Sequence, residues 1–152
     1  MSLLTRFISS FNEMKKNNFD KIYVAVDIHN TILVPCWHNA ETFNYFPLAK
    51  KTLQLMSERD DVCLILWTSS WDDTANATYK THFQKEKINF TWLNENPECQ
   101  NTDLACFNKK FYFSVGIDDR CGFNANIDWL PIFLYFKYKK IKDKIYHFRP
   151  KR

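Results

Sequence analysis

Short apolar runs that alternate with helix-like segments constrain this fold more than any other feature of the sequence. Residues 21–28, 62–68 and 111–117 are almost continuously apolar, as strands buried on both faces of a sheet are. Residues 88–94 alternate between apolar and polar types and are predicted as a further strand. The apolar run at 132–138 is predicted as a fifth strand.

The segments between these runs have helical patterns. Residues 47–60 begin with a proline and place four side chains on one face, namely Leu48, Thr52, Leu55 and Met56. Residues 72–87 carry acids in the first turn and lysines in the last, as the helix dipole favours. Strands alternating with helices predict an α/β fold with a three-layer, Rossmann-like parallel sheet and helices on both faces.

The two ends of the chain differ from this α/β domain, which is expected over residues 21–136. Residues 1–20 repeat apolar side chains at helical spacing and predict a helix that packs on the domain. Residues 137–152 hold eight Lys/Arg against one acid, a net charge of +7, whereas the preceding 136 residues carry a net charge of −3. The positive charge therefore belongs to a basic C-terminal tail, which makes nucleic acid a candidate partner.

Composition excludes several classes of protein. With only two glycines, the chain lacks the glycine-rich phosphate loops of nucleoside triphosphate and dinucleotide binders. Its apolar runs fall short of the roughly 20 residues of a transmembrane helix, so no membrane span is predicted. The five cysteines are odd in number and lack CxxC spacing. They indicate a reducing compartment, hence a cytoplasmic protein without structural zinc.

Polar side chains follow three of the predicted strands at the point where each ends. Asp27 ends the first strand, Thr68 and Ser69 follow the second, and Asp118 and Asp119 follow the fourth. The carboxyl ends of parallel strands meet at one edge of a sheet, where binding sites form. Converging carboxylates repel each other unless a cation lies between them, and hard oxygen ligands favour Mg²⁺.

In this order, the motifs resemble those of the haloacid dehalogenase superfamily. They are a strand with DxDx[TV], here VAVDIHNTI; a strand ending in Thr or Ser, here LILWTSS; a lysine, here in NKK; and a strand ending in an acidic pair, here SVGIDDR. The corresponding residues are Asp27 and Thr31, Thr68, Lys109 or Lys110, and Asp118 with Asp119. The resemblance covers roughly residues 21–136 and is to small bacterial or phage members, which implies no separate cap domain.

The resemblance implies a nucleophile and a metal site. Asp27 would attack phosphorus and form an aspartyl-phosphate. Its second oxygen, the backbone carbonyl of His29 and the Asp118 carboxylate would bind Mg²⁺, with Asp119 assisting through water. The backbone supplies the ligand at position 29, so a histidine there is compatible with metal binding.

The resemblance also assigns groups to the phosphoryl oxygens and the substrate. Thr68 and a lysine would hold the phosphoryl oxygens, and Lys110 is preferred to Lys109. The connection 33–46 is too short for a cap domain. Three further residues are candidates for substrate contacts: Ser69, Trp71 and Trp37.

His29 stands where the family's phosphatases carry a second aspartate that protonates the leaving group and activates water. An imidazole with an ordinary pKa near 6.5 suits proton transfer at neutral pH. Two interpretations stay open: His29 is the acid/base group, or it is a substrate contact or relic.

The function predicted from these residues and the resemblance is a Mg²⁺-dependent phosphohydrolase. Its substrate would be a small phosphate ester or a nucleotide. The alternative is a catalytically impaired relative that binds a phosphorylated ligand or nucleic acid.

Overall fold

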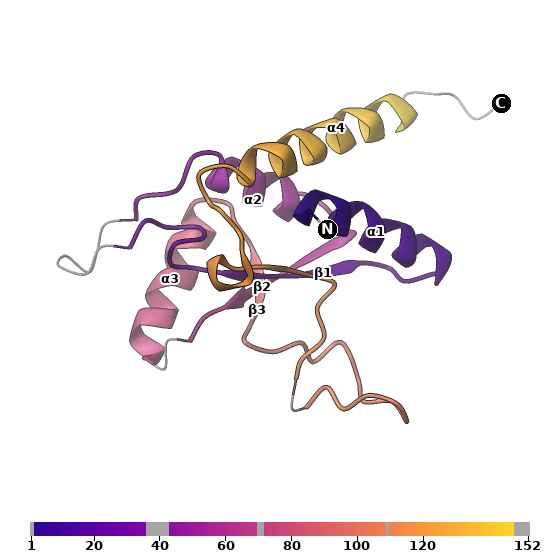
Figure 1. Ribbon diagram of the computed structural model, residues 1–152, viewed down its shortest axis with the longest axis horizontal. Helices are drawn as coiled ribbons and strands as arrows, with labels where there is room; N and C mark the ends of the chain where they lie inside the picture. The colour runs from indigo at the N-terminus through magenta and orange to yellow at the C-terminus, as the bar shows by residue number, and fades with distance from the viewer. Residues whose placement is uncertain (1, 36–42, 70–71, 109, 148–152) are drawn as a thin grey trace.

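The fold is built on a four-stranded parallel sheet, seen in a computed structural model that describes residues 2–35, 43–69, 72–108 and 110–147 (Figure 1). The strands β1 (Ile22–Asp27), β2 (Val62–Trp67), β3 (Phe90–Leu93) and β4 (Val115–Ile117) have the order β3-β2-β1-β4. All three neighbouring pairs are parallel. The sheet and its helices confirm the predicted α/β fold and are consistent with a Rossmann-like architecture. In the described residues, all four α-helices contribute to one core on a single face of the sheet, rather than covering both faces as predicted.

Four α-helices and one short 3₁₀ helix accompany the strands in the described residues. They are α1 (Leu3–Lys16), α2 (Ala49–Ser57), α3 (Asp73–Lys85), η1 (Asp119–Cys121) and α4 (Trp129–His147). The Ser2 hydroxyl accepts the Thr5 N–H at the start of α1, and the Asp72 carboxylate accepts two N–H groups at the start of α3. Such caps satisfy donors that have no partner within the helix.

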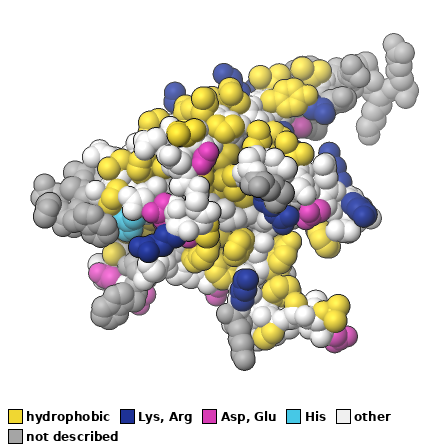
Figure 2. Space-filling model, viewed as in Figure 1, with side chains coloured by type: hydrophobic (Ala, Val, Ile, Leu, Met, Phe, Trp, Pro, Cys, Tyr) yellow, Lys and Arg dark blue, Asp and Glu magenta, His cyan; other side chains and the backbone are white. Residues whose placement is uncertain are grey.

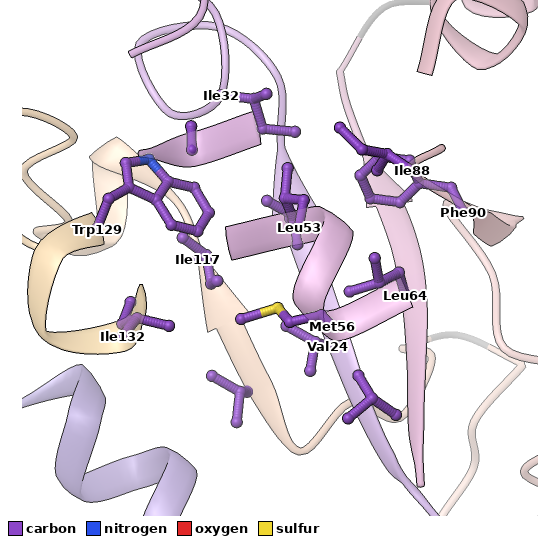
Figure 3. Close-up of a cluster of buried hydrophobic side chains, with 14 of the residues drawn as sticks. Val24, Ile32, Leu53, Met56, Leu64, Ile88, Phe90, Ile117, Trp129 and Ile132 are labelled. Carbon is purple, nitrogen blue, oxygen red and sulfur yellow. The ribbon is translucent and has the colours of Figure 1, made fainter. Parts of the chain in front are cut away.

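One face of the sheet carries the hydrophobic core (Figure 3). Alternate strand residues point into it, including Val24 and Leu64, which pair in register. Each α-helix adds buried side chains to the same cluster: Phe7 and Phe11 from α1, Leu53 and Met56 from α2, Phe83 from α3, and Trp129, Ile132 and Phe136 from α4. A single shared core therefore holds the helices on the sheet.

Aromatic side chains cover the opposite face. Ala25, Ile65 and Gly116 lie side by side there in register, and Phe113, from the connection between β3 and β4, lies over Gly116. A Cβ atom at Gly116 would stand 3.0 Å from the Phe113 ring, so a larger residue there would have to displace the ring by a few tenths of an ångström. The Trp67 ring extends the cover, 5.5 Å from Phe113 between centroids. In its described residues this connection contains no helix.

The predicted buried face of the first internal helix is partly wrong. Thr52 and Met56 are buried, but Ala49 and Leu53 accompany them rather than Leu48 and Leu55, which are only partly buried. Leu48 adopts a left-handed conformation with φ of 66° as the residue before the helix. The helix therefore begins later than expected and is rotated relative to the predicted face.

The predicted strand at 132–138 is wrong, because these residues belong to the 19-residue helix α4. Ile132 and Phe136 are buried one turn apart, whereas Leu134 and Tyr138 are exposed. Apolar residues on two opposite faces of one helix produce a continuous apolar run, which is also the pattern of a buried strand. The sequence pattern alone did not separate the two.

Residues 137–147 continue α4 instead of leaving the domain as a separate segment. Arg59 donates to Asp143 at 2.7 Å, and Lys140 pairs with Glu58. The Lys139 ammonium lies 3.7 Å from the centroid of the Phe11 ring, a cation–π contact. Among the described residues, no helix is long and apolar enough to cross a membrane.

The helical register of α4 can be tested by comparing two alanine variants. Phe136→Ala should lower the free energy of unfolding by about 3–5 kcal/mol because it removes a fully buried ring. Leu134→Ala should change it by less than about 0.5 kcal/mol because Leu134 is 54% exposed. Urea denaturation measures both values. Equal costs would indicate a strand, in which both side chains share a face.

Candidate metal centre

Three carboxylates converge at the carboxyl edge of the sheet. β1 ends at Asp27, and Asp118 and Asp119 follow β4, the strand paired with β1. Each of the three offers an oxygen, and these oxygens all lie within 4.8 Å of one another. The parallel register that pairs Val26 with Ile117 makes the two strands end together. The sheet therefore places the acidic groups in one cluster.

A tight turn after β1 positions Asp27. The Ile28 carbonyl accepts the N–H groups of Ile32 and Leu33, each at 2.9 Å. Asn30 adopts a left-handed conformation with φ of 57°, which asparagine tolerates better than most residues. This turn brings the Thr31 side chain back towards the end of the strand.

Thr31 connects three elements at the site. Its hydroxyl accepts the Asp119 N–H at 3.1 Å, and its interaction with the Asp27 carboxylate acts to lower the pKa of that group. Its carbonyl accepts the Trp129 indole N–H at 2.9 Å. Both Thr31 and Trp129 are fully buried. Through these contacts, the buried threonine links the ends of β1 and β4 to the start of α4.

The second acidic segment is ordered by its own short helix. The Asp118 carboxylate accepts the Arg120 N–H at 2.8 Å and caps η1. Gly122 ends this helix in a left-handed conformation with φ of 91°. Because one Asp118 oxygen accepts the capping bond, the carboxylate orientation is defined before any ligand binds.

The pKa of Asp27 is raised from an ordinary 3.8 to about 6. Partial removal from water is the main cause, and the charges of Asp118 and Asp119 add to it. Hydrogen bonds from the Ile28 N–H and the Thr31 hydroxyl act in the opposite direction. At neutral pH the Asp27 carboxylate is therefore charged at a cost that a bound cation would remove.

The donor set fits a hard divalent cation. All three groups are carboxylates, and no Lys or Arg in the described part of the chain forms an ion pair with them. Oxygen ligands of this kind suit Mg²⁺, which retains several waters beside one or two carboxylates. The cysteines are not part of the cluster, which removes the soft ligands that favour zinc.

Thr68 lies at the neighbouring strand end. It follows Trp67, the residue that pairs with Asp27 across β1 and β2. The Thr68 N–H donates to the Asn94 side-chain oxygen at 2.8 Å, and the Asn94 side-chain amide donates to the Thr68 carbonyl at 2.7 Å. This reciprocal pair orients the backbone after β2. Sequence reasoning missed Asn94, although its place directly after β3 is the same kind of signal as the other strand ends.

The His29 side chain is directed towards α3. Its Nε2 lies 3.0 Å from the Tyr79 hydroxyl, with the two rings edge to face. Burial lowers the His29 pKa and favours neutral imidazole. The imidazole is not part of the group of oxygens that converge at the sheet edge. Nothing in the sequence pointed to Tyr79 as its partner.

The remaining predicted site residues are less closely tied to the cluster. Ser69 is exposed directly after Thr68, and Lys110 is exposed before β4. No hydrogen bond or ion pair between Lys110 and the three carboxylates is found within the described ranges. Trp37, Trp71 and Lys109 lie outside the described residues.

A pocket of about 350 Å³ adjoins the acidic cluster. Asp119 forms part of its wall together with Asn30, from the turn after β1, and the two asparagines Asn124 and Asn126. Side-chain amides can both donate to and accept from a ligand. The pocket was not expected from the sequence, because it depends on the turn after η1.

Comparison with protein-family models, with curated proteins and with solved structures found no match.

Magnesium should stabilise the folded protein. Mg²⁺ at a hundred times its dissociation constant adds about 2.7 kcal/mol, or roughly 5–10 °C in Tm for a chain of this size. Thermal denaturation with and without millimolar Mg²⁺ measures the shift. The double variant Asp27→Asn with Asp118→Asn should lose it, whereas Asp103→Asn, an exposed aspartate outside the cluster, should keep it. An unchanged parent Tm would contradict the site.

Without metal, Asp27→Asn should raise the stability at pH 7. The folded pKa of about 6 exceeds the ordinary 3.8, so the folded state binds the proton more tightly than the unfolded state does. Stability of the metal-free parent should therefore fall as pH rises from about 4 to about 6 and stay level above that. Asp27→Asn should flatten this slope, measured by urea denaturation in EDTA across that range. A slope unchanged by the substitution would show that Asp27 is not its source.

Proposed function

We propose that this protein is a Mg²⁺-dependent phosphohydrolase of the haloacid dehalogenase type, acting on a small phosphate ester or nucleotide. The observation that carries the proposal is the convergence of Asp27, Asp118 and Asp119 at one edge of a parallel sheet. The motifs that resemble this superfamily supply the same three residues in the same order. The acidic cluster and the sequence motifs thus both support metal-dependent phosphoryl transfer.

In the proposed reaction, Asp27 is the nucleophile. One of its oxygens attacks phosphorus, the ester oxygen leaves, and an aspartyl-phosphate forms that water then hydrolyses. The Thr31 hydroxyl interacts with the Asp27 carboxylate and would limit its rotation, which favours an attacking geometry. A cation held by Asp27 and Asp118 would supply charge neutralisation for the phosphoryl oxygens.

The other residues would bind the substrate. Thr68 lies at the neighbouring strand end, and its hydroxyl would donate to a phosphoryl oxygen. Ser69 and Lys110 are exposed and are candidates for further substrate contacts. The pocket beside Asp119, with its three asparagines, is large enough for the ester group of a small substrate.

A second candidate function is phosphoryl-ligand binding with little or no turnover. The His29 imidazole contacts Tyr79 on α3 and lies outside the acidic cluster. A group that must deliver a proton to the leaving oxygen has to be within hydrogen-bond reach of it. This contact favours a protein that binds, or reacts once, without efficient release.

The nucleophile can be tested with ester hydrolysis and a phosphoryl analogue. The parent should hydrolyse p-nitrophenyl phosphate or a nucleotide only with Mg²⁺, and Asp27→Asn should reduce the rate at least about a hundredfold. Beryllium trifluoride should form an adduct with the parent, visible by fluorine NMR, and none with Asp27→Asn. Asp103→Asn serves as the matched control. If neither turnover nor adduct is seen with the parent, the proposal fails.

The role of His29 separates the two candidate functions. We expect weak turnover in the parent and a rise of about tenfold or more in His29→Asp, because a carboxylate there restores acid/base catalysis. The double variant Asp27→Asn with His29→Asp should be inactive, which shows that the gain uses the same nucleophile. A vigorous parent that loses activity in His29→Asp would instead make histidine the working acid/base group.

A further inference from the structure

The outer surface of α4 carries an exposed line of apolar side chains, here called the outer ridge. Its members recur at spacings of three or four residues and are each at least half exposed: Leu130, Leu134, Tyr138, Ile141 and Ile145. Hydrophobic side chains gather along this edge of the molecule in the space-filling view (Figure 2). An apolar line of this length on a helix surface indicates an interaction site.

The outer ridge lies opposite the core. At about 100° per residue, Leu134 and Ile141 are on the far side of the helix from Ile132 and Phe136, which are buried. The domain therefore covers one face of α4 and leaves the other uncovered by any element of the described chain. Packing within the domain does not account for the ridge.

Lysines border the outer ridge on both sides. Lys137 and Lys144 lie along one side and Lys142 along the other, from the same helical geometry. The helix contains a single acid, Asp143, which pairs with Arg59 on the side of the domain. The surface around the ridge is therefore positively charged, with no acid of α4 directed to it.

A groove between α2 and α4 adds to this charge. It measures about 410 Å³, and four lysines line it: Lys51, Lys137, Lys140 and Lys144. Its one acid, Glu58, is paired with Lys140. The groove is thus a basic hollow, open beside the apolar ridge, and its charge matches that of an anionic headgroup.

The charges argue against a second copy of this chain as the partner. Two outer ridges packed against each other would bring the lysines of both helices together in either orientation. Like charges beside an apolar helix seam oppose such pairing. The partner must be anionic and must accept a convex apolar ridge.

We infer that α4 binds the surface of an anionic lipid bilayer through the outer ridge. The helix would lie parallel to the surface, with the ridge in the boundary between headgroups and acyl chains. The lysines on both sides would extend to the lipid phosphates, and the groove would take a headgroup. Over Leu130–Ile145 the contact is about 22 Å long.

Vesicle sedimentation with the full chain tests this inference. The protein should pellet with vesicles of three parts phosphatidylcholine to one part phosphatidylserine, and not with phosphatidylcholine alone. Leu134→Ser with Ile141→Ser should abolish pelleting, whereas Leu104→Ser, which alters a leucine that is 99% exposed outside α4, should not. Tm values close to that of the parent show that the variants are folded.

The lysines are tested in the same assay. Lys137→Gln with Lys144→Gln should weaken binding about fivefold per lysine and reduce its salt dependence. Lys80→Gln with Lys85→Gln, both exposed on α3, is the matched control. The inference is overturned if the parent pellets with neither vesicle, or if the serine variants pellet as the parent does. It is also overturned if the parent binds duplex DNA through the lysines independently of the ridge, or forms a dimer through it.

Discussion

The arrangement of this site depends on one buried residue, Thr31. Its hydroxyl accepts the Asp119 N–H and interacts with the Asp27 carboxylate, and its carbonyl accepts the indole N–H of Trp129. These bonds join the turn after β1, the segment after β4 and the start of α4, which come from distant parts of the sequence. A buried hydrogen-bonded group defines distances more sharply than apolar packing does. The position of Thr31 therefore helps to set the positions of the carboxylates relative to one another.

Bringing the three carboxylates together costs electrostatic free energy in the folded state. Asp27 is partly withdrawn from water next to two other acids, and its raised pKa measures the cost. Elsewhere in the described chain, partly buried charged groups form complementary pairs, as between Arg59 and the acids Asp61 and Asp143. Uncompensated like charge at a sheet edge is typical of functional sites rather than of stabilising ones. This contrast supports the proposed metal-dependent chemistry independently of any family resemblance.

Much of the fold could be predicted from local patterns, and the failures have physical causes. The strands β1 and β2 were evident because buried parallel strands are continuously apolar, and Asp72 marked the start of α3. The helix α4 was missed because its two apolar faces imitate a buried strand. Leu48 was wrongly assigned to the buried face of α2 because it lies before the helix in a left-handed conformation.

For the site, the sequence indicated which residues belong together but not how they are held. The three carboxylates could be grouped because parallel strands end at one edge. The contacts between Asn94 and Thr68 and between Tyr79 and His29 join residues 26 and 50 positions apart. Side-chain contacts across such separations depend on tertiary packing and leave no periodic signal.

The separation between β1 and β4 has a consequence for folding kinetics. The bond between Thr31 and Asp119 closes a loop of 88 residues, and β4 is the strand furthest along the chain. Long-range pairings of this kind form slowly, because the chain loses entropy in closing the loop before stabilising contacts form. The carboxylates therefore meet only when β4 docks, and their repulsion opposes that docking. A cation that binds the finished site would mainly slow the release of β4, giving the protein a longer native lifetime with little change in its rate of folding.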